Sequence, residues 1–178
     1  MKVYVISDIH GSKKYLEDFL NIFDNEKGDK LIILGDVLYH GPRNPFPLEY
    51  SPKDVIKLLN ERKDKIIWIK GNCDSEVDEM VLDFPCEVRK TISINNKTFH
   101  LTHGHKENID NMTIEKGEIL LYGHFHVNFI EEVDGKIIAN PGSISLPKND
   151  TKNSYMVIEN NKMTIYSLEH EKLIEKDM

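Results

Sequence analysis

The chain has few cysteines and no long apolar run, and each shortage excludes a class of protein. Its 178 residues contain only two cysteines, Cys73 and Cys86, which form neither a CxxC pair nor a disulfide framework. A reducing compartment, the cytoplasm, is therefore expected. The apolar start MKVYVIS is too short for a signal peptide, and no later run approaches the length of a membrane span. We therefore expect a cytoplasmic protein with no membrane partner.

Positive charge is also scarce. The chain has 23 Lys and Arg against 30 Asp and Glu, a formal net charge of −7. This balance argues against a broad basic face for nucleic acid, although bound divalent cations would cancel part of the negative charge locally. Repeats, low-complexity tracts and Gly/Ser linkers are absent. Residues 1–178 are accordingly predicted to form a single domain.

The first half of the chain alternates short apolar runs with amphipathic segments. Strands are expected at 2–7, 30–36 and 65–72, and helices at 12–23 and 51–62. Ser12 is a fitting N-cap for the first helix. Ser51 and Pro52 begin the second, with Asp54 three positions past the cap. This βαβαβ order predicts a parallel sheet with crossover helices.

The second half changes character. Residues 90–105 are expected to form two strands joined at the sequence NNK, and further short strands are expected in EILLYGHFH, GKIIANPGS and SYMVIENNKMTIYSL, before a charged tail. Tight turns between short strands predict a mainly antiparallel arrangement. Two sheets with helices on the outside indicate a layered α/β sandwich.

Asp, His and Asn residues follow five of the apolar runs, at the point where each run ends. They are Asp8 and His10, Asp36, Asn72, His103 and His105, and His124 and His126. Taken singly, each is ordinary: an Asp there is commonly a cap or turn residue, and GN is a common turn dipeptide. The carboxyl ends of parallel strands, however, share one sheet edge, where ligands bind. So many polar side chains at one edge are costly to bury unless cations pair them.

The kinds of ligand narrow the choice of metal. Mixed oxygen and nitrogen donors without thiolate do not suit a structural zinc site. They suit Mn²⁺, Fe²⁺, Zn²⁺ or Ni²⁺ at a site with open positions for water and substrate. The candidates outnumber the ligands that one ion needs. We therefore expect two divalent ions, with Mn²⁺ favoured, and one carboxylate that bridges them.

In their order, these motifs resemble the calcineurin-like metallophosphoesterase pattern. DIH, GD, GNCD, THGH and GHFH, within residues 8–126, stand against D-x-H, G-D, G-N-H-D/E, H and G-H-x-H. The stretches GDVLYHGPRNPFP, GNCDSEVDEM and NPGSISLPK are similar to a bacterial subgroup, the YfcE-type phosphodiesterases. The resemblance implies a four-layer α/β/β/α sandwich, with two mixed sheets flanked by helices and the metals at their shared edge.

The resemblance also implies a role for each site residue. The first metal is held by Asp8, His10 and His126, the second by Asn72, His103 and His124, and both by Asp36. The implied reaction is hydrolysis of small or aryl phosphodiesters by a hydroxide between two ions about 3.5–4 Å apart. Asp36, Asn72 and Cys73 are the expected catalytic residues. Arg43 and His105 are candidates for binding substrate, and His40, His100 and His170 are expected to be structural.

Cys73 departs from the family pattern, because it stands where the family has a histidine thought to assist the leaving group. An ordinary thiol titrates near ~8.5 and donates only weak hydrogen bonds. Three interpretations are open: Cys73 fills space while substrates bring good leaving groups, it is a nucleophile, or activity is vestigial. The first is favoured, because a metal-bound hydroxide already supplies a nucleophile and the YfcE-type subgroup also carries cysteine here.

The proline-rich segment 39–52 and the choice of function class leave alternatives. This segment, which contains Arg43, is predicted to be a rigid connection, a subunit contact in a homo-oligomer, or a substrate-recognition loop. The main alternative to an enzyme is a non-catalytic protein-binding scaffold of the same fold, such as a retromer-type subunit. The seven filled ligand positions favour the enzyme. A repair nuclease is disfavoured, because those proteins carry the motif histidine and an additional domain.

Overall fold

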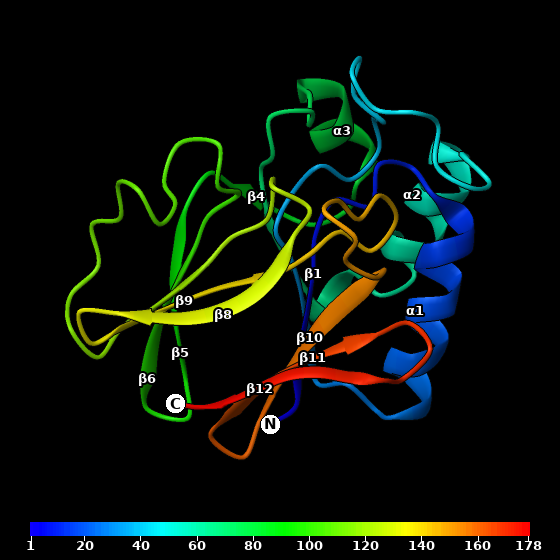
Figure 1. Cartoon of the computed structure of the whole chain (residues 1–178). Helices are drawn as coiled ribbons and strands as arrows, with labels where there is room; N and C mark the ends of the chain where they lie inside the picture. Colours follow the sequence, from blue (N-terminus) through cyan, green and yellow to red (C-terminus); the bar gives the residue numbers. More distant parts are fainter.

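Two β-sheets packed against each other form the centre of the structure, a computed structural model that describes all 178 residues (Figure 1). The larger sheet has the order β12 (Lys172–Asp177), β11 (Lys162–Ser167), β10 (Ser154–Glu159), β1 (Val3–Ile6), β2 (Lys30–Ile33), β3 (Ile66–Ile69) and β4 (Cys86–Glu87). The smaller has the order β5 (Lys90–Ile94), β6 (Lys97–Leu101), β7 (Ile119–Leu121), β9 (Lys136–Pro141) and β8 (Asn128–Val133). The helices are α1 (Lys13–Asn25), α2 (Pro52–Asn60), α3 (Glu76–Val81) and a 3₁₀ turn, η1 (Lys63–Lys65).

The first half of the chain folds as the βαβαβ order predicts. Strand β2 pairs in parallel with β1 and β3, and β4 extends the parallel set. The Ser12 side chain caps α1 by accepting from the backbone N–H of Tyr15, as predicted. Ser51 behaves differently at α2, because its hydroxyl donates to the Asp54 carboxylate at 2.7 Å and caps no backbone N–H. The second cap is thus a side-chain pair next to a proline.

In the second half, the predicted hairpin is present and the antiparallel expectation holds only in part. Asn95 and Asn96 turn between β5 and β6 with φ of 50° and 61°, the left-handed conformation that a two-residue hairpin needs. Strand β7, however, pairs in parallel with both β6 and β9. The long segment between β6 and β7 makes this crossover feasible.

The C-terminal strands return to the larger sheet. Strand β10 pairs antiparallel with β1, and β11 and β12 continue outward to the edge. The segment expected to be a charged tail is therefore the edge strand β12. Leu173 and Ile174 explain the difference, because both pack against the core between the sheets.

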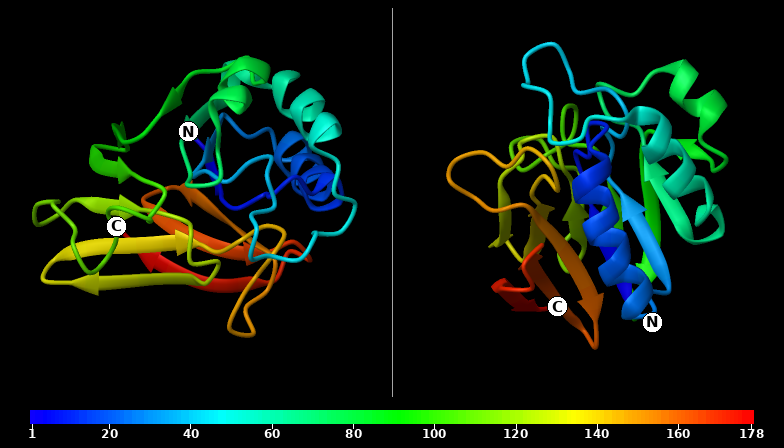
Figure 2. Two further views of the ribbon diagram at one scale, coloured as in Figure 1. Left: turned by 90° about the horizontal axis from the view of Figure 1, so that it is seen from above. Right: turned by 90° about the vertical axis from the view of Figure 1, so that its right-hand side faces the viewer.

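Alternating residues of each central strand bury two separate cores. Val3 and Val5 face the smaller sheet, where they contact residues such as Phe99 and Leu121. Tyr4 and Ile6 face the opposite side, where the apolar stripe of α1 covers them together with α2 (Figure 2). The period-two alternation of a strand thus places β1 at the centre of both cores.

The outermost layers differ on the two sides. Helices cover the larger sheet, whereas the irregular segment 104–118 covers the outer face of the smaller sheet, packing Ile114 on Leu120. Asn108 and Asn111 bond to backbone groups in this segment, which competes with helix formation. The α/β class and the two mixed sheets are confirmed; the outer layer on the smaller sheet is a loop instead of a helix. None of the helices combines the length and the apolar character that crossing a membrane requires.

Candidate metal centre

The polar residues that follow the strands meet at one end of the two sheets. Asp8 and His10 follow β1, Asp36 follows β2, Asn72 follows β3, His103 follows β6, and His124 and His126 follow β7. Among the groups of three whose ligand atoms lie within 4.8 Å of one another, two consist of carboxylates and histidines alone: Asp8 with His10 and His126, and Asp36 with His103 and His124. These are the two groupings, apart from Asn72, that the sequence resemblance implies.

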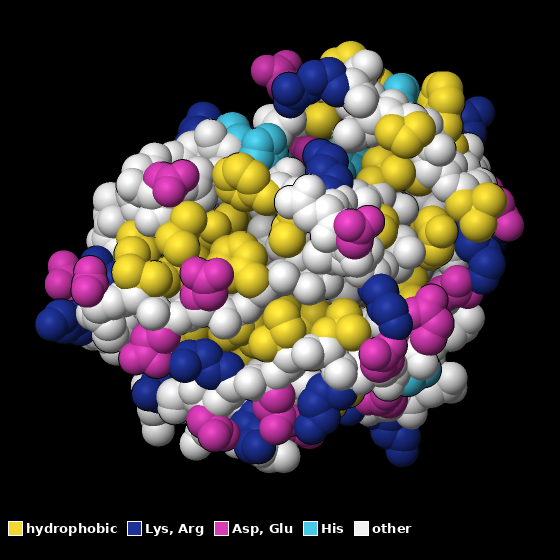
Figure 3. All heavy atoms as spheres, viewed as in Figure 1, with side chains coloured by type: hydrophobic (Ala, Val, Ile, Leu, Met, Phe, Trp, Pro, Cys, Tyr) yellow, Lys and Arg dark blue, Asp and Glu magenta, His cyan; other side chains and the backbone are white.

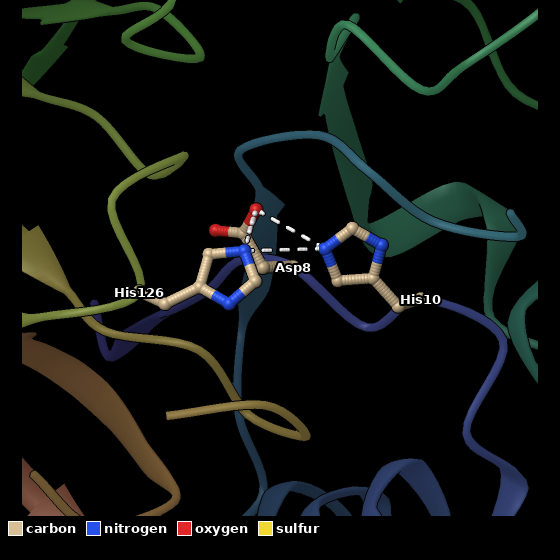
Figure 4. Close-up of side chains that lie close together, drawn as sticks. All are labelled: Asp8, His10 and His126. Carbon is tan, nitrogen blue, oxygen red and sulfur yellow. Dashed lines mark hydrogen bonds and ion pairs between the residues drawn. The ribbon is translucent and has the colours of Figure 1, made fainter. Parts of the chain in front are cut away.

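The first group is compact and buried (Figure 4). His10 Nε2 lies 3.2 Å from His126 Nε2 and 3.7 Å from Asp8 Oδ1. His126 Nε2 lies 3.3 Å from the same carboxylate oxygen. Three donor atoms from distant parts of the chain therefore surround one small volume.

Asp36 lies between this group and the second one. Its Oδ2 is 3.8 Å from His10 Nε2, and its Oδ1 is 3.4 Å from His103 Nε2. His103 Nε2 is in turn 3.0 Å from Asn72 Oδ1. The two oxygens of one carboxylate thus face different groups, the arrangement that a bridging ligand requires.

Backbone carbonyls fix the rings of three of the histidines. The Nδ1 atoms of His10, His103 and His126 lie 2.8, 2.6 and 2.6 Å from the carbonyl oxygens of Tyr39, Leu34 and Leu146, respectively. A ring nitrogen that faces a carbonyl must carry the hydrogen, so the neutral ring presents a bare Nε2 on its other side. This is the tautomer that a histidine needs to bind metal through Nε2.

The donor set fits a divalent cation and fits poorly without one. With neutral rings, the Nε2 lone pairs of His10 and His126 face each other at 3.2 Å, where no hydrogen bond can form between them. Asp8 Oδ1 is buried without a hydrogen-bond partner. Leaving a buried polar group unsatisfied costs about 1–3 kcal/mol. A cation between these atoms would satisfy all three.

The pKa shifts within the centre also favour a bound cation. Burial opposes ionisation of Asp8 and Asp36, but the adjacent histidines outweigh it and hold the pKa of both carboxyls below the ordinary value. Burial alone would lower the pKa of His103, yet the two carboxylates raise it to about 9. Burial also lowers the pKa of His10 and His124. The proton on His103 thus balances negative charge that a metal would otherwise neutralise, and metal binding must displace it.

Backbone strain is concentrated at the same place. Five of the seven candidate ligands have left-handed backbones, with φ between 48° and 66°: Asp8, His10, Asp36, His124 and His126. Such conformations are uncommon for residues other than glycine and cost on the order of 1 kcal/mol each. Backbone hydrogen bonds between the loops hold two of them, from Asp8 N to Gly35 O at 3.0 Å and from His10 N to Asp36 O at 2.9 Å. Strain of this kind is typical of functional sites.

Asp74 supports Asp36, a role that the sequence analysis missed. Its buried carboxylate accepts from the N–H groups of Gly71, Asp36 and Val37 at 2.7, 2.9 and 2.8 Å. These bonds hold the loops after β2 and β3 together. Asp74 is the last residue of GNCD, so the motif itself contained the signal.

The NPGSISLPK stretch supports Asp8 from the other side. The hydroxyls of Ser143 and Ser145 donate to the Asp8 carbonyl at 2.8 and 2.9 Å. Asn140 donates to the Gly123 carbonyl at 2.7 Å, next to His124. A stretch singled out only for its resemblance therefore builds the frame of the first group.

Cys73 lies at the centre with an unreactive thiol. Its N–H donates to Asp36 Oδ1 at 2.8 Å, and its sulfur lies within 4.8 Å of donor atoms of His10 and Asp36. Burial, reinforced by the Asp36 charge, raises the pKa of the thiol to about 12. The thiolate is the nucleophilic form of cysteine, so this environment weighs against the nucleophile interpretation.

A cleft of about 700 Å³ opens over the centre. Asp36, Asn72, Cys73, His124 and His126 line it from below, and Tyr39, Arg43, Asn44 and Lys148 line it from the surrounding loops. Figure 3 shows acidic, basic and histidine side chains gathered in a hollow at the top of the molecule. Arg43, a candidate from the sequence, thus lines the cleft, as do Lys148 and Asn44, which the sequence analysis did not single out.

The other histidines lie elsewhere. The His105 ring is 5.4 Å from that of His103, but His105 lines a separate hollow of about 210 Å³ beside Arg89. His40 packs among the aromatic rings of segment 39–52, and His100 Nε2 lies 2.8 Å from Glu118. Neither lines the cleft, and nor does His170.

Known proteins share both the motifs and the fold. A model of the calcineurin-like phosphoesterase superfamily domain matches residues 1–163. The chain belongs to this superfamily. It is 39% identical over 176 residues to the phosphodiesterase YfcE of Escherichia coli K12, covering 98% of this chain and 96% of that one. A phosphodiesterase of Methanocaldococcus jannaschii is 30% identical over 151 residues, covering 80% and 83%.

Solved structures share the fold of this chain. The Escherichia coli phosphoesterase Yfce superposes with a TM-score of 0.97 at 37% identity, covering 99% of each chain. Zinc-bound Vps29 of Entamoeba histolytica has a TM-score of 0.66 at 22% identity, with 99% of each chain covered, which shows a common fold. The chain is thus a phosphoric ester hydrolase of the metallophosphoesterase fold, and its superfamily implies divalent metal ions as cofactors.

Proposed function

We propose that this metallophosphoesterase hydrolyses small or aryl phosphodiesters with the help of two divalent ions, preferably Mn²⁺. The observation that carries the proposal is the position of Asp36, whose two oxygens face the two groups of histidines. The relationship to two phosphodiesterases supports diesters as the substrate class. A bound water activated by the ions would attack phosphorus in line with the leaving group.

Each residue of the centre has a distinct part in this proposal. Asp8, His10 and His126 would hold one ion, Asn72, His103 and His124 the other, and Asp36 both. The carbonyls behind the rings keep each Nε2 aimed at its ion. His124, half-buried on the floor of the cleft, is placed to meet both ion and substrate. His105 would have a supporting role, because it lines a neighbouring hollow together with His103 and does not line the cleft.

The setting of the enzyme follows from the same features. We propose that residues 1–178 act as one domain in the cytoplasm, where the unpaired Cys73 and Cys86 stay reduced. Exposed Phe46 and Leu48 on segment 39–52 offer a surface for self-association. A non-catalytic protein-binding scaffold of the same fold is the second candidate. The complete ligand set favours hydrolysis over that role.

Metal removal tests the proposal directly. Dialysis against a chelator is expected to abolish hydrolysis of bis(p-nitrophenyl) phosphate, because the ions would supply both the Lewis acid and the nucleophile. Adding Mn²⁺ back should restore it with about two ions bound per chain. The monoester p-nitrophenyl phosphate, assayed alongside, should react far more slowly. Full activity in metal-free protein would contradict the proposal. So would a protein that binds the ions but hydrolyses neither ester, the result expected of a scaffold.

The half-buried thiol of Cys73, with its raised pKa, predicts that the hydrolysis rate depends strongly on the leaving group. A thiol with a pKa of about 12 is a weaker acid than the phenols expelled, so it cannot readily protonate them. General acid catalysis, typically worth about 10²–10⁴-fold, is then missing. Across aryl methyl phosphodiesters, kcat/KM should fall steeply as the pKa of the leaving phenol rises, with the same slope in Cys73→Ala. A flat series with chemistry rate-limiting would refute this interpretation.

A further inference from the structure

Two cations line the cleft without a partner. Arg43 and Lys148 form no ion pair with any carboxylate and no side-chain hydrogen bond, although the chain has 30 acidic residues. The other two arginines, Arg62 and Arg89, are both in ion pairs. Unpaired surface lysines are common, but the exposed Arg43 is the one arginine of this acidic chain without an ion pair, and it borders the cleft.

The acidic groups of the cleft are already engaged. Asp36 and Asp74 are the only carboxylates in its lining. Asp74 accepts three backbone N–H groups, and Asp36 faces the histidines of the centre. Neither is free to neutralise Arg43 or Lys148. The two cations are therefore available to an anion from outside.

Both cations stand on backbone that is held in place. The N–H of Lys148 donates to the His126 carbonyl at 3.0 Å, and the Thr151 hydroxyl donates to the Lys148 carbonyl at 2.7 Å. Arg43 follows Pro42 in a short turn that Asn44 closes by donating to the His40 carbonyl at 2.9 Å. The backbone of Lys148 is thus tied to that of His126, and Arg43 stands in a hydrogen-bonded turn.

A simple diester does not use this charge. If two divalent ions were held with Asp8, Asp36 and a hydroxide, the net charge there would be about +1, which one diester anion would neutralise. The charges of Arg43 and Lys148 would remain unmatched. The cleft volume of about 700 Å³ is that of a site for a larger ligand than a phosphate group alone.

We propose that Arg43 and Lys148 form a subsite for a second anionic group, so that the preferred substrates are phosphodiesters with a carboxylate or phosphate on the group that is not expelled. This inference rests on the proposed function and names its substrate class. A guanidinium binds either anion in a bidentate manner, and a lysine adds a point charge. Asn44, which also lines the cleft, is next to Arg43 in the same turn.

Substrates that differ only in distal charge test the subsite. We would compare p-nitrophenyl phosphodiesters of 3-hydroxypropanoate, of its neutral amide and of choline with the Mn²⁺-loaded enzyme. The leaving group is the same in all three, so only the distal charge changes. The anionic ester should exceed the amide in kcat/KM by about tenfold to hundredfold, the range for a charge-assisted hydrogen bond. Choline should rank last, and spacers of about one to four methylenes would find the best reach.

Variants of Arg43 and Lys148 would show whether these two side chains cause the preference for the anionic ester. Arg43→Gln and Lys148→Met should each reduce the anionic-to-neutral ratio severalfold, and the double variant should bring it close to one. Lys116→Met is the matched control, because Lys116 is an exposed, unpaired lysine outside the cleft. It removes the same charge and should leave the ratio unchanged. Melting temperatures would confirm that all variants fold.

Three results would overturn the subsite. They are a wild-type ratio near one at every spacer length, an equal loss on all three esters in the variants, and an equal effect of Lys116→Met. An equal loss would assign the cations to the reacting phosphate or the leaving group. If the Mn²⁺-loaded enzyme hydrolysed none of the esters, the proposed function itself would fail and the subsite with it.

Discussion

Replacing Asp36 with asparagine is expected to lower kcat/KM for bis(p-nitrophenyl) phosphate by at least about 10³-fold, since metal ions supply several kcal/mol of transition-state stabilisation. The variant keeps the size of the side chain and its oxygen for the Cys73 N–H, but loses the charge that faces His10 and His103. Both ions should therefore be lost together. Loss of one ion would show that Asp36 belongs to a single group.

Ion counts on three variants measure this bridging role. Asp36→Asn should bind almost no metal at a concentration that saturates the wild type, whereas His10→Gln should retain about one ion, because His10 belongs to the first group only. Asp110→Asn is the matched control, an exposed aspartate in segment 104–118. It should keep both ions and full activity. Circular dichroism would show that the folds are intact.

Comparing Cys73→Ala with Asp36→Asn distinguishes the effect of the Asp36 charge from that of packing at the centre. Cys73 and Asp36 touch, yet only Asp36 faces both histidine groups. Cys73→Ala should therefore keep both ions and most of the activity. Equal losses in Cys73→Ala and Asp36→Asn would mean that the thiol takes part in the chemistry.

The sequence was sufficient to locate the centre because its chemistry is encoded by residue type. Asp8 and Asp36 follow strands that pair in parallel, and the carboxyl ends of parallel strands share an edge whatever their separation in the chain. The short apolar run at 2–7 predicted the buried strand β1, and the sequence NNK between two strands predicted the hairpin turn at Asn95 and Asn96. Local rules of this kind need no knowledge of tertiary contacts.

Other features depend on contacts that a single sequence does not display. The left-handed backbones of His124 and His126 persist only because neighbouring loops hold them. Nothing in ILL identifies β7 as a parallel strand, since three buried aliphatic residues fit either pairing. Lys148 gave no signal of its own, because a lysine in a loop is ordinarily solvated. Lys148 becomes a candidate only because it lines a cleft together with residues more than a hundred positions away in the chain.

Asp74 is the clearest case, and its removal should be costly. Asp74→Ala leaves the N–H groups of Gly71, Asp36 and Val37 without their acceptor. Each buried unsatisfied group costs about 1–3 kcal/mol, and water that enters the site would recover part of this by bonding to the N–H groups. We therefore expect the free energy of unfolding to fall by roughly 3–5 kcal/mol. For a chain of this size that lowers the melting temperature by roughly 10 °C or more. Thermal melts followed by circular dichroism would measure it.

Asp78 offers a matched comparison for this loss. It is also a buried aspartate that accepts from a backbone N–H, but it closes the cap of α3 with Ser75 and does not contact Asp36. Asp78→Ala should therefore cost only about 1 kcal/mol, the usual value of a cap, and leave metal binding intact. Asp74→Asn should fall between the two alanine variants, because one amide oxygen can still serve the N–H groups of Asp36 and Gly71. If Asp74→Ala were no less stable than Asp78→Ala and bound both ions normally, the backbone hold on Asp36 would have to come from elsewhere.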